Sequence, residues 1–543
     1  MKRSPVFWLY QACLAIQGRL ALIACCGLCD IAVSLAFVYV SKLAIDYAIH
    51  GSSIGSYAIY VYGMALLGLY LLELGLTLLV SLLESKVEID VKNRLRHRLF
   101  DHLAQVLYED WEQLHSGDVL NRMEEDVRIV SDCIAKSLPK LLVAAVQVVA
   151  AFIFLYVMNP MLACAIVFVM PLFLLSSKLF FVKLRKLTKD IRDSDGGVQV
   201  LMQESLQHQL LLKSMNQYEL LSAKLSGMQS LLYGQTIRLT HFNLYSRGMV
   251  SLGFIIGYMI AFVWGLAGLQ ERAITYGMMT AFLQLVGRIQ RPTVELAHLI
   301  PSVIRASASI DRLQELEALP VEMVGGSEVR EGILGLRIED LSFRYRVTEK
   351  YVYRHFSYDF KPGSRTAVVG ETGAGKTTLV KLMLSLLYPE EGHIVLYDKE
   401  ECVPMSPHER ANFVYVPQGN SLLSGTVRSN LCLGNANATD EQMWEALHVA
   451  VADFVKDLPG QLDSRCGEFG DGLSEGQAQR IAIARGLLQS GSIMLLDELS
   501  ASLDENTERT LIERLMRHVA GKTVIFVTHR KLILQYCDDV ITL

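Results

Sequence analysis

Residues Thr366–Leu384 read TAVVGETGAGKTTLVKLML and decide the fold of the second half of the chain. The apolar run Thr366–Val369 predicts a buried strand, and the amphipathic pattern after Lys376 predicts a helix. Between them, Gly370–Thr377 matches the spacing G-x-x-x-x-G-K-[ST]. Glycines at this spacing let backbone N–H groups wrap phosphates at a helix N-terminus. The stretch therefore predicts a nucleotide-binding loop in an α/β domain.

The loop residues have separate expected roles. Lys376 should neutralise the β- and γ-phosphates of a nucleotide, and the Thr377 hydroxyl should take one site on Mg²⁺. The expected nucleotide contacts comprise the whole loop and the start of the helix: Gly370, Glu371, Thr372, Gly373, Ala374, Gly375, Lys376, Thr377 and Thr378.

Two further strands bring acid–base residues to the same predicted sheet. Ile493–Leu496 is an apolar strand that ends in Asp497 and Glu498, and Thr523–Thr528 is another that is followed by His529. Carboxylates at the carboxyl end of a strand lie where open α/β sheets bind ligands. We expect Asp497 to hold Mg²⁺ through water and Glu498 to polarise the attacking water as a general base.

The first 300 positions have a different composition from the rest. The chain has 543 residues, a formal net charge of −5, 51% hydrophobic residues and a mean hydropathy of +0.31. The charge excludes a polybasic nucleic-acid binder, so nucleic acid is not an expected partner. The long uncharged stretches predict residence in a lipid bilayer. Ten cysteines without framework spacing are expected to be reduced or buried thiols.

Six stretches are long and apolar enough to be predicted as membrane spans, each of about 20 residues or more. The pair Asn159-Pro160 predicts a minimal turn between the third and the fourth span. The segments 84–137 and 183–245 are long, helical in pattern and rich in basic residues, so they and both termini are expected in the cytoplasm. The predicted spans are approximately 20–47, 57–83, 138–158, 160–182, 246–270 and 273–300.

Four ionisable residues fall within these spans: Asp30, Glu73, Arg288 and Arg291. Each would cost about 2.5–3.5 kcal/mol at a helix centre, so they should face protein or water rather than lipid. Two interpretations stay open. In one, the charged residues line a substrate path. In the other, the acids pair with the arginines to hold the bundle together, or the charged residues lie near the cytoplasmic mouth where water reaches them.

The order of the remaining motifs carries a family resemblance. Gln418, Leu473–Gln477 (LSEGQ), Asp497-Glu498, Ser500–Asp504 (SASLD) and His529 follow the phosphate loop in the order found in ABC transporters. Together with six spans, the chain resembles an exporter-type (type IV) half-transporter. The resemblance implies an all-α six-helix transmembrane domain with long cytoplasmic helical extensions, followed by an α/β P-loop NTPase ATP-binding cassette domain. The expected boundaries are 1–318 for the transmembrane domain, 319–333 for a linker and 334–543 for the cassette.

The resemblance also implies roles for single residues. Tyr345 would stack on adenine, Gln418 would sense Mg²⁺ and the attacking water, and His529 would join Glu498 in catalysis. The signature residues Ser474, Gly476 and Gln477 would contact the γ-phosphate of ATP held by an opposing subunit, which makes the working unit a dimer. Cys466–Gly472 resembles the exporter-specific segment before the signature, and looser matches to exporter loop segments lie at Ser116–Val127 and Glu204–Glu219.

The departures from the family pattern are few. Glu475 stands where a glycine is commoner in the signature, and the chain ends at Leu543, earlier than relatives usually do. About 19 residues precede the first span, so no N-terminal peptidase domain is expected. Because every catalytic position is filled, a homodimer is favoured, and a heterodimer with a second half-transporter stays open.

The function implied is ATP-driven export by alternating access, with hydrolysis at Glu498 resetting the transporter. An importer that uses the exporter fold and a non-transport ABC regulator are the alternatives. Amphipathic small molecules, lipids and peptides all remain open as substrates. The expected location is a bacterial cytoplasmic membrane, with both termini and the cassette in the cytoplasm.

Overall fold

The computed structural model describes residues 4–50, 56–114, 116–322, 329–346, 350–371, 373–467, 472–499 and 503–543. Its side chains are described except at 5–6, 50, 56, 166–185, 246–247 and 297. Contacts divide the chain into two compact units, one of residues 1–100 with 117–318 and one of residues 101–116 with 319–543. All ten cysteines lie among the described residues and are free, as predicted.

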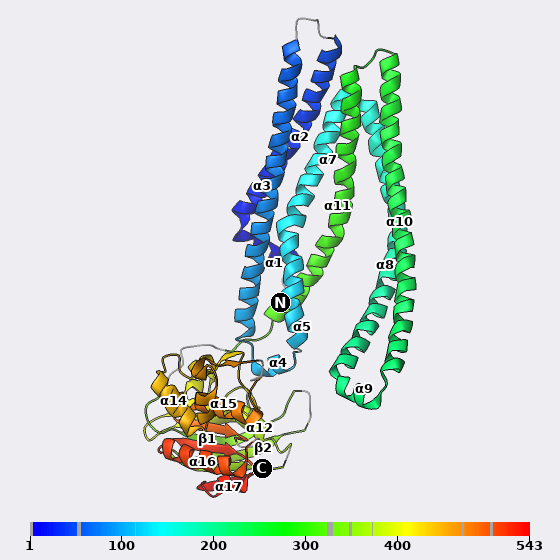
Figure 1. Cartoon of the computed structure of the whole chain (residues 1–543). Coiled ribbons are helices and arrows are strands. Elements are labelled where there is room, and N and C mark those ends of the chain that lie inside the picture. The colour runs from blue at the N-terminus through cyan, green and yellow to red at the C-terminus, as the bar shows by residue number, and fades with distance from the viewer. Residues whose placement is uncertain are drawn as a thin grey trace. The chain divides into compact units, whose positions relative to one another are not determined.

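The described residues of the first unit form helices joined by short turns (Figure 1). Two π-helical turns, at Arg122–Asp126 and Cys133–Ser137, join α5, α6 and α7 into one helical run. The helices of the unit are α1 Pro5–Leu14, α2 Gln17–His50, α3 Ser56–Leu103, α5 Ser116–Asn121, α6 Val127–Asp132, α7 Leu138–Met158, α8 Pro160–Gln207, α9 Gln209–Met215, α10 Tyr218–Gln270 and α11 Tyr276–Glu317.

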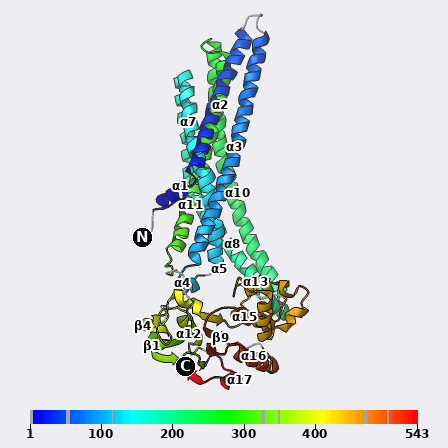
Figure 2. The same cartoon turned by 90° about the vertical axis from the view of Figure 1, so that its left-hand side faces the viewer.

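The turn between α7 and α8 is as short as the sequence predicts. Asn159 is extended and its side chain accepts a hydrogen bond from Leu162 N at 3.0 Å, while Pro160 fills the first helical position. An N-cap acceptor followed by proline is a strong helix start. Two views show α8 and α10 running side by side, joined by the short α9 (Figures 1 and 2).

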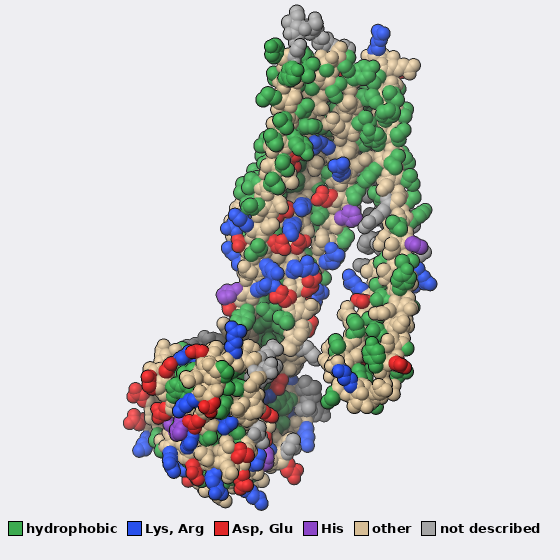
Figure 3. Space-filling view, in the orientation of Figure 1, with side chains coloured by type: hydrophobic (Ala, Val, Ile, Leu, Met, Phe, Trp, Pro, Cys, Tyr) green, Lys and Arg blue, Asp and Glu red, His purple; other side chains and the backbone are tan. Residues whose placement is uncertain are grey.

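Within the described residues, four helical stretches are long and apolar enough to cross a membrane: Gln17–Ile49, Tyr57–Leu103, Ser116–Met158 and Tyr218–Gln270. Hydrophobic side chains cover one end of this helical unit, and charged side chains gather toward the other (Figure 3). The predicted fourth span lies in α8, largely where side chains are not described. The predicted sixth span lies in α11, which does not reach this apolar threshold, so the number of six spans stays a prediction.

The helix α11 lies inside the helical unit. Its residues Phe282, Leu285 and Ile289 are almost fully buried and pack in one cluster with residues of α2, α7, α8 and α10. A helix covered by protein on several sides does not have to be apolar to the same degree as one that faces lipid. This packing explains why α11 tolerates polar residues within a predicted span.

Within the described residues, the second unit contains a small antiparallel sheet of β7 and β8 and two larger sheets. One of the larger sheets is antiparallel with the order β2-β1-β4-β5, and the other is parallel with the order β11-β3-β10-β9-β6. Its strands are β1 Gly335–Phe343, β2 Tyr353–Phe360, β3 Arg365–Val369, β4 Glu391–Tyr397, β5 Cys402–Pro404, β6 Phe413–Val416, β7 Gly425–Thr426, β8 Arg465–Cys466, β9 Ile493–Asp497, β10 Thr523–Val527 and β11 Asp539–Thr542.

Helices flank these strands in the second unit, and β9 and β10 are buried along their whole length. Strands buried on both faces are expected in a parallel sheet covered by helices. The helices of this unit are α4 Tyr108–Glu112, α12 Lys376–Met383, α13 Val427–Cys432, α14 Asp440–Val449, α15 Glu475–Leu487, α16 Glu505–His518 and α17 Lys531–Leu534.

The short helix α4 belongs to the second unit although it comes from the first part of the sequence. Leu107 N donates to Pro320 O at 3.0 Å, and Glu322 N donates to Gln105 O at 2.7 Å. The segment 101–116 therefore groups with the cassette, whereas the sequence prediction assigned it to a loop of the transmembrane domain.

Candidate functional site

Four neighbouring strands of the parallel sheet end at one edge. In the order β3-β10-β9-β6 all pairs are parallel, and Val527 at the end of β10 is in register with Val368 and Asp497. The phosphate loop follows β3, His529 follows β10, Glu498 follows β9 and Gln418 follows β6. The topology thus brings together four segments that are far apart in sequence, at the edge where such sheets bind ligands.

The phosphate loop is held in a conformation that requires glycine. Gly373 has φ +88° and Gly375 has φ +101°. A Cβ on Gly375 would lie 2.9 Å from the Tyr353 hydroxyl, which donates to Gly375 O at 3.0 Å. The Lys376 ammonium lies inside the loop and donates to Gly370 O at 2.6 Å and to Glu371 O at 3.1 Å. Thr372 lies outside the described residues.

Two adjacent threonines at the start of α12 point in different directions. The side chain of Thr377 is exposed, so its hydroxyl is accessible to a ligand. Thr378 is buried, and its Oγ1 lies 3.0 Å from the Tyr345 hydroxyl. The Tyr345 ring packs edge-on against Phe343 with centroids 5.1 Å apart. The predicted adenine-stacking residue is therefore fixed next to the phosphate-loop helix.

Glu498 is held at this edge through its backbone and its side chain. Its φ of +43° is rare for a residue with a side chain. Its backbone N–H donates to Val527 O at 2.9 Å, and its carbonyl accepts from Gln479 Nε2 at 3.0 Å. Its carboxylate accepts from Gln418 Nε2 at 2.5 Å and lies 3.8 Å from His529 Nδ1. Three of the predicted catalytic side chains, Glu498, Gln418 and His529, thus lie together.

Asp497 differs from its neighbour in burial. It is 4% exposed, whereas the side chain of Glu498 is 20% exposed. Burial, aided by the negative charge of Glu498 and opposed by Lys376, raises the pKa of Asp497 to about 6. At neutral pH this carboxylate is ionised in an unfavourable environment, so a nearby cation would stabilise it.

The oxygen atoms at this edge fit a magnesium ion. Gln418 donates to Glu498 through its amide nitrogen, which leaves its amide oxygen as an acceptor. That oxygen, the Thr377 hydroxyl and the buried Asp497 carboxylate are hard oxygen donors of the kind Mg²⁺ prefers, with water completing the shell. Among the described residues no group of three or more His, Cys, Asp or Glu residues forms a metal cluster. An ion here would therefore depend partly on nucleotide phosphates.

The signature residues are not part of this edge. Ser474 Oγ accepts from Gln477 N at 3.2 Å, and Gln477 Oε1 accepts from Ser474 N at 2.9 Å, which is a capping box at the start of α15. Within the described part of the chain, no hydrogen bond or ion pair joins Ser474, Gly476 or Gln477 to the phosphate loop. The segments 468–471 and 500–502, which carry parts of two further motifs, lie outside the described residues.

Sequence reasoning missed two groups of residues near this edge. Gln479 and Tyr353 hold Glu498 and the phosphate loop through backbone carbonyls, and their side chains carry no sequence signal for that contact. Arg346 and Lys381 form ion pairs with α4, where Arg346 lies 3.2 Å from both Glu109 and Asp110, and Lys381 lies 2.7 Å from Glu112. A pocket beside α4 is lined by Glu109, Glu112, Gln113, Tyr345 and Arg346.

The four ionisable residues of the predicted spans behave differently from one another. Arg288 Nη1 lies 3.6 Å from Glu73 Oε1, so these two form an ion pair. Arg291 is exposed, and Oδ1 of Asp30 is buried without a hydrogen-bond partner among the described residues. Mutual balance therefore describes Glu73 and Arg288, whereas Asp30 interacts electrostatically with both of them without forming an ion pair among the described residues.

The fold and this edge define a P-loop nucleotide-binding domain joined to a helical membrane domain. Family models identify both parts: residues 20–293 match the model described as ABC transporter transmembrane region, and residues 353–501 match the model described as ABC transporter. The chain belongs to the ABC transporters, as a multi-pass membrane protein with an ATP-binding domain. The predicted fold class and the resemblance to half-transporters are confirmed.

Relatives of known sequence and structure agree with this assignment. The "Multidrug resistance ABC transporter ATP-binding and permease protein" of Lactococcus lactis subsp. lactis (strain IL1403) is 29% identical over 448 residues, covering 81% of this chain and 75% of the relative. The "ATP-dependent lipid A-core flippase" of Pseudomonas fluorescens (strain Pf0-1) is 27% identical over 467 residues, covering 84% and 77%. The solved structure of a bacterial Atm1-family ABC exporter with ATP bound has a TM-score of 0.79 at 20% identity, covering 97% of this chain and 93% of that one. The chain therefore has the exporter fold.

Proposed function

We propose that this chain is an ATP-driven exporter that works by alternating access as a dimer of two identical copies. The observation that carries the proposal is the edge at which Gln418 and His529 flank the Glu498 carboxylate beside the phosphate loop, in a chain with membrane-spanning helices. The proposed location is a bacterial cytoplasmic membrane, with both termini and the cassette in the cytoplasm.

The proposed chemistry follows from the positions of the side chains. Lys376 and the loop N–H groups bind the terminal phosphates, and Glu498 accepts the proton of the attacking water as a general base. Gln418 orients the Glu498 carboxylate, and His529, close to its other oxygen, stabilises the γ-phosphate. A bound Mg²⁺, held by Thr377, Gln418 and Asp497 in part through water, would supply charge neutralisation at the phosphates.

A second copy completes the proposed site. In one chain Ser474, Gly476 and Gln477 make no described contact with the phosphate loop, so we assign them to ATP held by the partner subunit. ATP that touches both subunits only in the closed dimer binds that state more tightly and shifts the equilibrium toward closure. Because all catalytic positions of this chain are filled, two identical copies would form two competent sites.

Helix α4 offers a route from nucleotide to membrane domain. Arg346 follows the proposed adenine-stacking Tyr345 directly and pairs with Glu109 and Asp110 of α4. Lys381, on the phosphate-loop helix, pairs with Glu112. We propose that nucleotide binding changes the position of α4 through these ion pairs.

The substrate proposal stays at the level of class. Amphipathic small molecules, lipids and peptides fit an exporter of this architecture. The relatives named above are a multidrug transporter and a lipid A-core flippase, which favours the first two classes.

The test is ATP hydrolysis by this chain purified alone into lipid nanodiscs, compared with Glu498→Gln. We expect steady turnover from the wild type, a loss of at least about 100-fold in the variant, and retained ATP binding. Glu513→Gln, which removes an exposed acid of α16, is the matched control and should hydrolyse ATP normally. Equal turnover in wild type and Glu498→Gln would refute the assigned base, and no turnover in either would refute the self-sufficient homodimer.

Direction needs a separate measurement. In inside-out vesicles, an exporter should accumulate an amphipathic dye when ATP is added outside, and Glu498→Gln should not. Accumulation only in right-side-out vesicles loaded with ATP would contradict export.

A further inference from the structure

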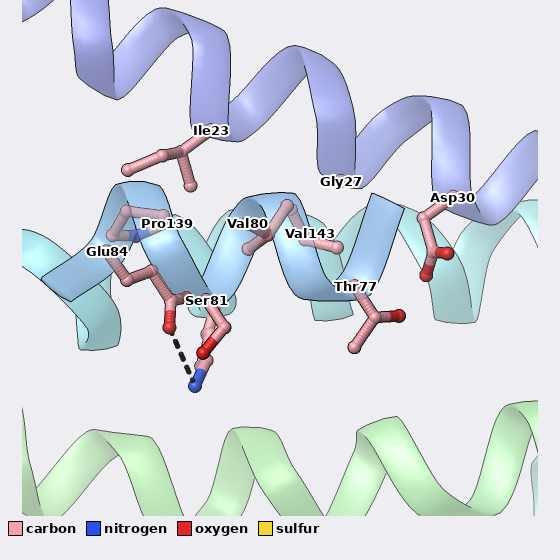
Figure 4. Close-up of a pocket in the computed structure, with 10 residues that line it drawn as sticks. Ile23, Gly27, Asp30, Thr77, Val80, Ser81, Glu84, Pro139 and Val143 are labelled. Carbon is pink, nitrogen blue, oxygen red and sulfur yellow. Dashed lines mark ion pairs between the residues drawn. The ribbon is translucent and has the colours of Figure 1, made fainter. Parts of the chain in front are cut away.

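A cavity of about 350 Å³ lies between α2, α3 and α7 (Figure 4). Apolar side chains line the cavity along its length, among them Ile23, Val80 and Val143. Figure 4 shows Asp30 near Thr77 toward one end and Glu84 near Ile23 toward the other. Asp30 and Ile23 are seven residues apart on one helix, so the two ends are separated by about 10 Å at 1.5 Å per residue.

At each end of the cavity, one carboxylate oxygen has no hydrogen-bond partner among the described residues. Glu84 is only 5% exposed, and its Oε1 is buried without a hydrogen-bond partner among the described residues. Asp30 Oδ1 is buried and unpartnered in the same sense. Leaving such a group unsatisfied costs about 1–3 kcal/mol, and more when it is charged. Two such oxygens on one cavity point to a ligand that carries hydrogen-bond donors.

The charges around the cavity do not cancel. Lys140 Nζ lies 3.4 Å from Glu84 Oε2, which balances the charge of Glu84, and Arg288 balances Glu73 nearby. Asp30 has no ion pair among the described residues. Arg288 interacts electrostatically with both Asp30 and Glu73, so two acids share one arginine at this end of the cavity and negative charge is in excess there.

The missing partner is not a metal ion. The two acids lie at opposite ends of the cavity, too far apart to bind one ion together, and the described residues contain no cluster of three metal-binding side chains. The apolar lining instead suits a hydrocarbon body, as in most small-molecule sites.

We propose that this cavity binds an amphipathic organic monocation. Its ammonium group pairs with Asp30, its apolar body lies along Ile23, Val80 and Val143, and a hydrogen-bond donor at its far end reaches Glu84 Oε1. Glu84 directly follows the second predicted span, 57–83, so this end lies near the predicted membrane boundary. A transported amine and the ethanolamine headgroup of a lipid both supply such an ammonium group.

The site is tested without nucleotide, so the result is independent of the proposed export cycle. The full chain in phosphatidylglycerol nanodiscs is melted with increasing 8-amino-1-octanol, whose length matches the cavity. We expect a saturable rise in melting temperature, from which an apparent Kd follows. The matched probes octan-1-ol and 8-hydroxyoctanoate, which lack the positive charge, should give no saturable rise.

Variants locate the site. Asp30→Asn should weaken the apparent affinity at least tenfold, whereas Asp30→Glu should keep it. Glu271→Gln, an exposed acid at the end of α10, is the matched control and should bind as the wild type does. Val80→Trp fills the cavity without removing a charge and should also abolish binding, which guards against an Asp30 variant that does not fold. Equal affinity in wild type and Asp30→Asn, or equal binding of 8-hydroxyoctanoate, would overturn the proposal.

A second experiment, with a different lipid composition, distinguishes the two sources of the ammonium group. In nanodiscs containing phosphatidylethanolamine, a headgroup in the cavity should compete with the amine, and native mass spectrometry should find this lipid on the wild type but not on Asp30→Asn. Undiminished amine affinity in those nanodiscs would identify a soluble amine as the occupant. Both results support the ammonium site, and they differ in what fills it.

Discussion

Replacing Asp497 by asparagine should make the nucleotide-free protein more stable at neutral pH. The carboxylate is 4% exposed, and its pKa is raised from 3.8 to about 6, chiefly by burial and further by Glu498. Because the folded-state pKa is higher than the unfolded one, the folded protein holds this proton between about pH 4 and pH 6. Stability from this group is therefore present at low pH and is lost as the pH rises through 6.

The size of the effect follows from the same values. A rise from 3.8 to about 6 corresponds to about 3 kcal/mol, at 1.36 kcal/mol for each tenfold change in the proton equilibrium. Asparagine keeps the shape but needs hydrogen bonds of its own, so we expect a gain of about 1–3 kcal/mol at pH 7.5. For a domain of this size, the gain raises the melting temperature by roughly 2–12 °C.

The assay is thermal unfolding of the full chain in nanodiscs without nucleotide, from pH 5 to pH 8. Trp444 packs against the core of the cassette and reports its unfolding by fluorescence. The advantage of Asp497→Asn over wild type should be full at pH 7.5 and should shrink toward pH 5. Asp457→Asn, which removes an exposed acid from the same unit, controls for the loss of one negative charge.

Two results would refute the reasoning. A difference between Asp497→Asn and wild type that does not change with pH would show that burial of the carboxylate is not its source. A less stable variant at pH 7.5 would show that the native charge is favourable even without a cation. Addition of Mg²⁺ and ATP should stabilise the wild type more than the variant, because only the wild type offers the carboxylate.

Three further predictions concern the same unit. Gln479→Ala removes the hydrogen bond to the Glu498 carbonyl, so kcat for ATP hydrolysis should fall at least about tenfold with little change in KM, and an equal loss in both would contradict a positioning role. Gly375→Ala places a methyl group against the phosphate loop at φ +101°, so nucleotide affinity in a fluorescent-ATP titration should drop by at least about tenfold, and near wild-type affinity would show that the loop relaxes. Lys381→Gln and Glu112→Gln should each reduce substrate-stimulated ATP hydrolysis, and a double-mutant cycle should give a coupling of about 0.5–1 kcal/mol in stability, whereas additive effects would remove α4 from the proposed route.

Local motifs made much of the cassette predictable. The predicted strand Thr366–Val369 differs from β3 by one residue, and Ile493–Leu496 differs from β9 by one. The reason is physical: a glycine-rich loop between a strand and a helix can adopt few backbone conformations, and these require specific residue types that are visible in the sequence. The parallel order then forces the loop, Glu498, Gln418 and His529 to one edge.

Contacts made across the fold were not predictable in this way. Gln479 reaches Glu498 because α15 packs under the sheet edge, and no spacing in the sequence records that approach. The grouping of residues 101–116 with the cassette depends on backbone hydrogen bonds to Pro320 and Glu322, which any side chain could accompany. The positive φ of Glu498 is likewise accompanied by two such contacts, one from its N–H to Val527 O and one from the Gln479 side chain to its carbonyl.

In the membrane unit, hydropathy predicts the spans, but only the tertiary packing shows how the charged residues within them pair. Glu73 and Arg288 lie on different helices, and only their 3.6 Å approach shows that each is the counter-ion of the other. Glu84 also has a counter-ion, Lys140. Of the three acids Glu73, Glu84 and Asp30, Asp30 alone makes no ion pair among the described residues. A membrane protein retains an unbalanced acid at about 2.5–3.5 kcal/mol only if some compensating interaction exists. Arg288 compensates Asp30 only in part, because it is shared with Glu73, and the proposed bound cation would supply the remaining charge and the hydrogen-bond donor.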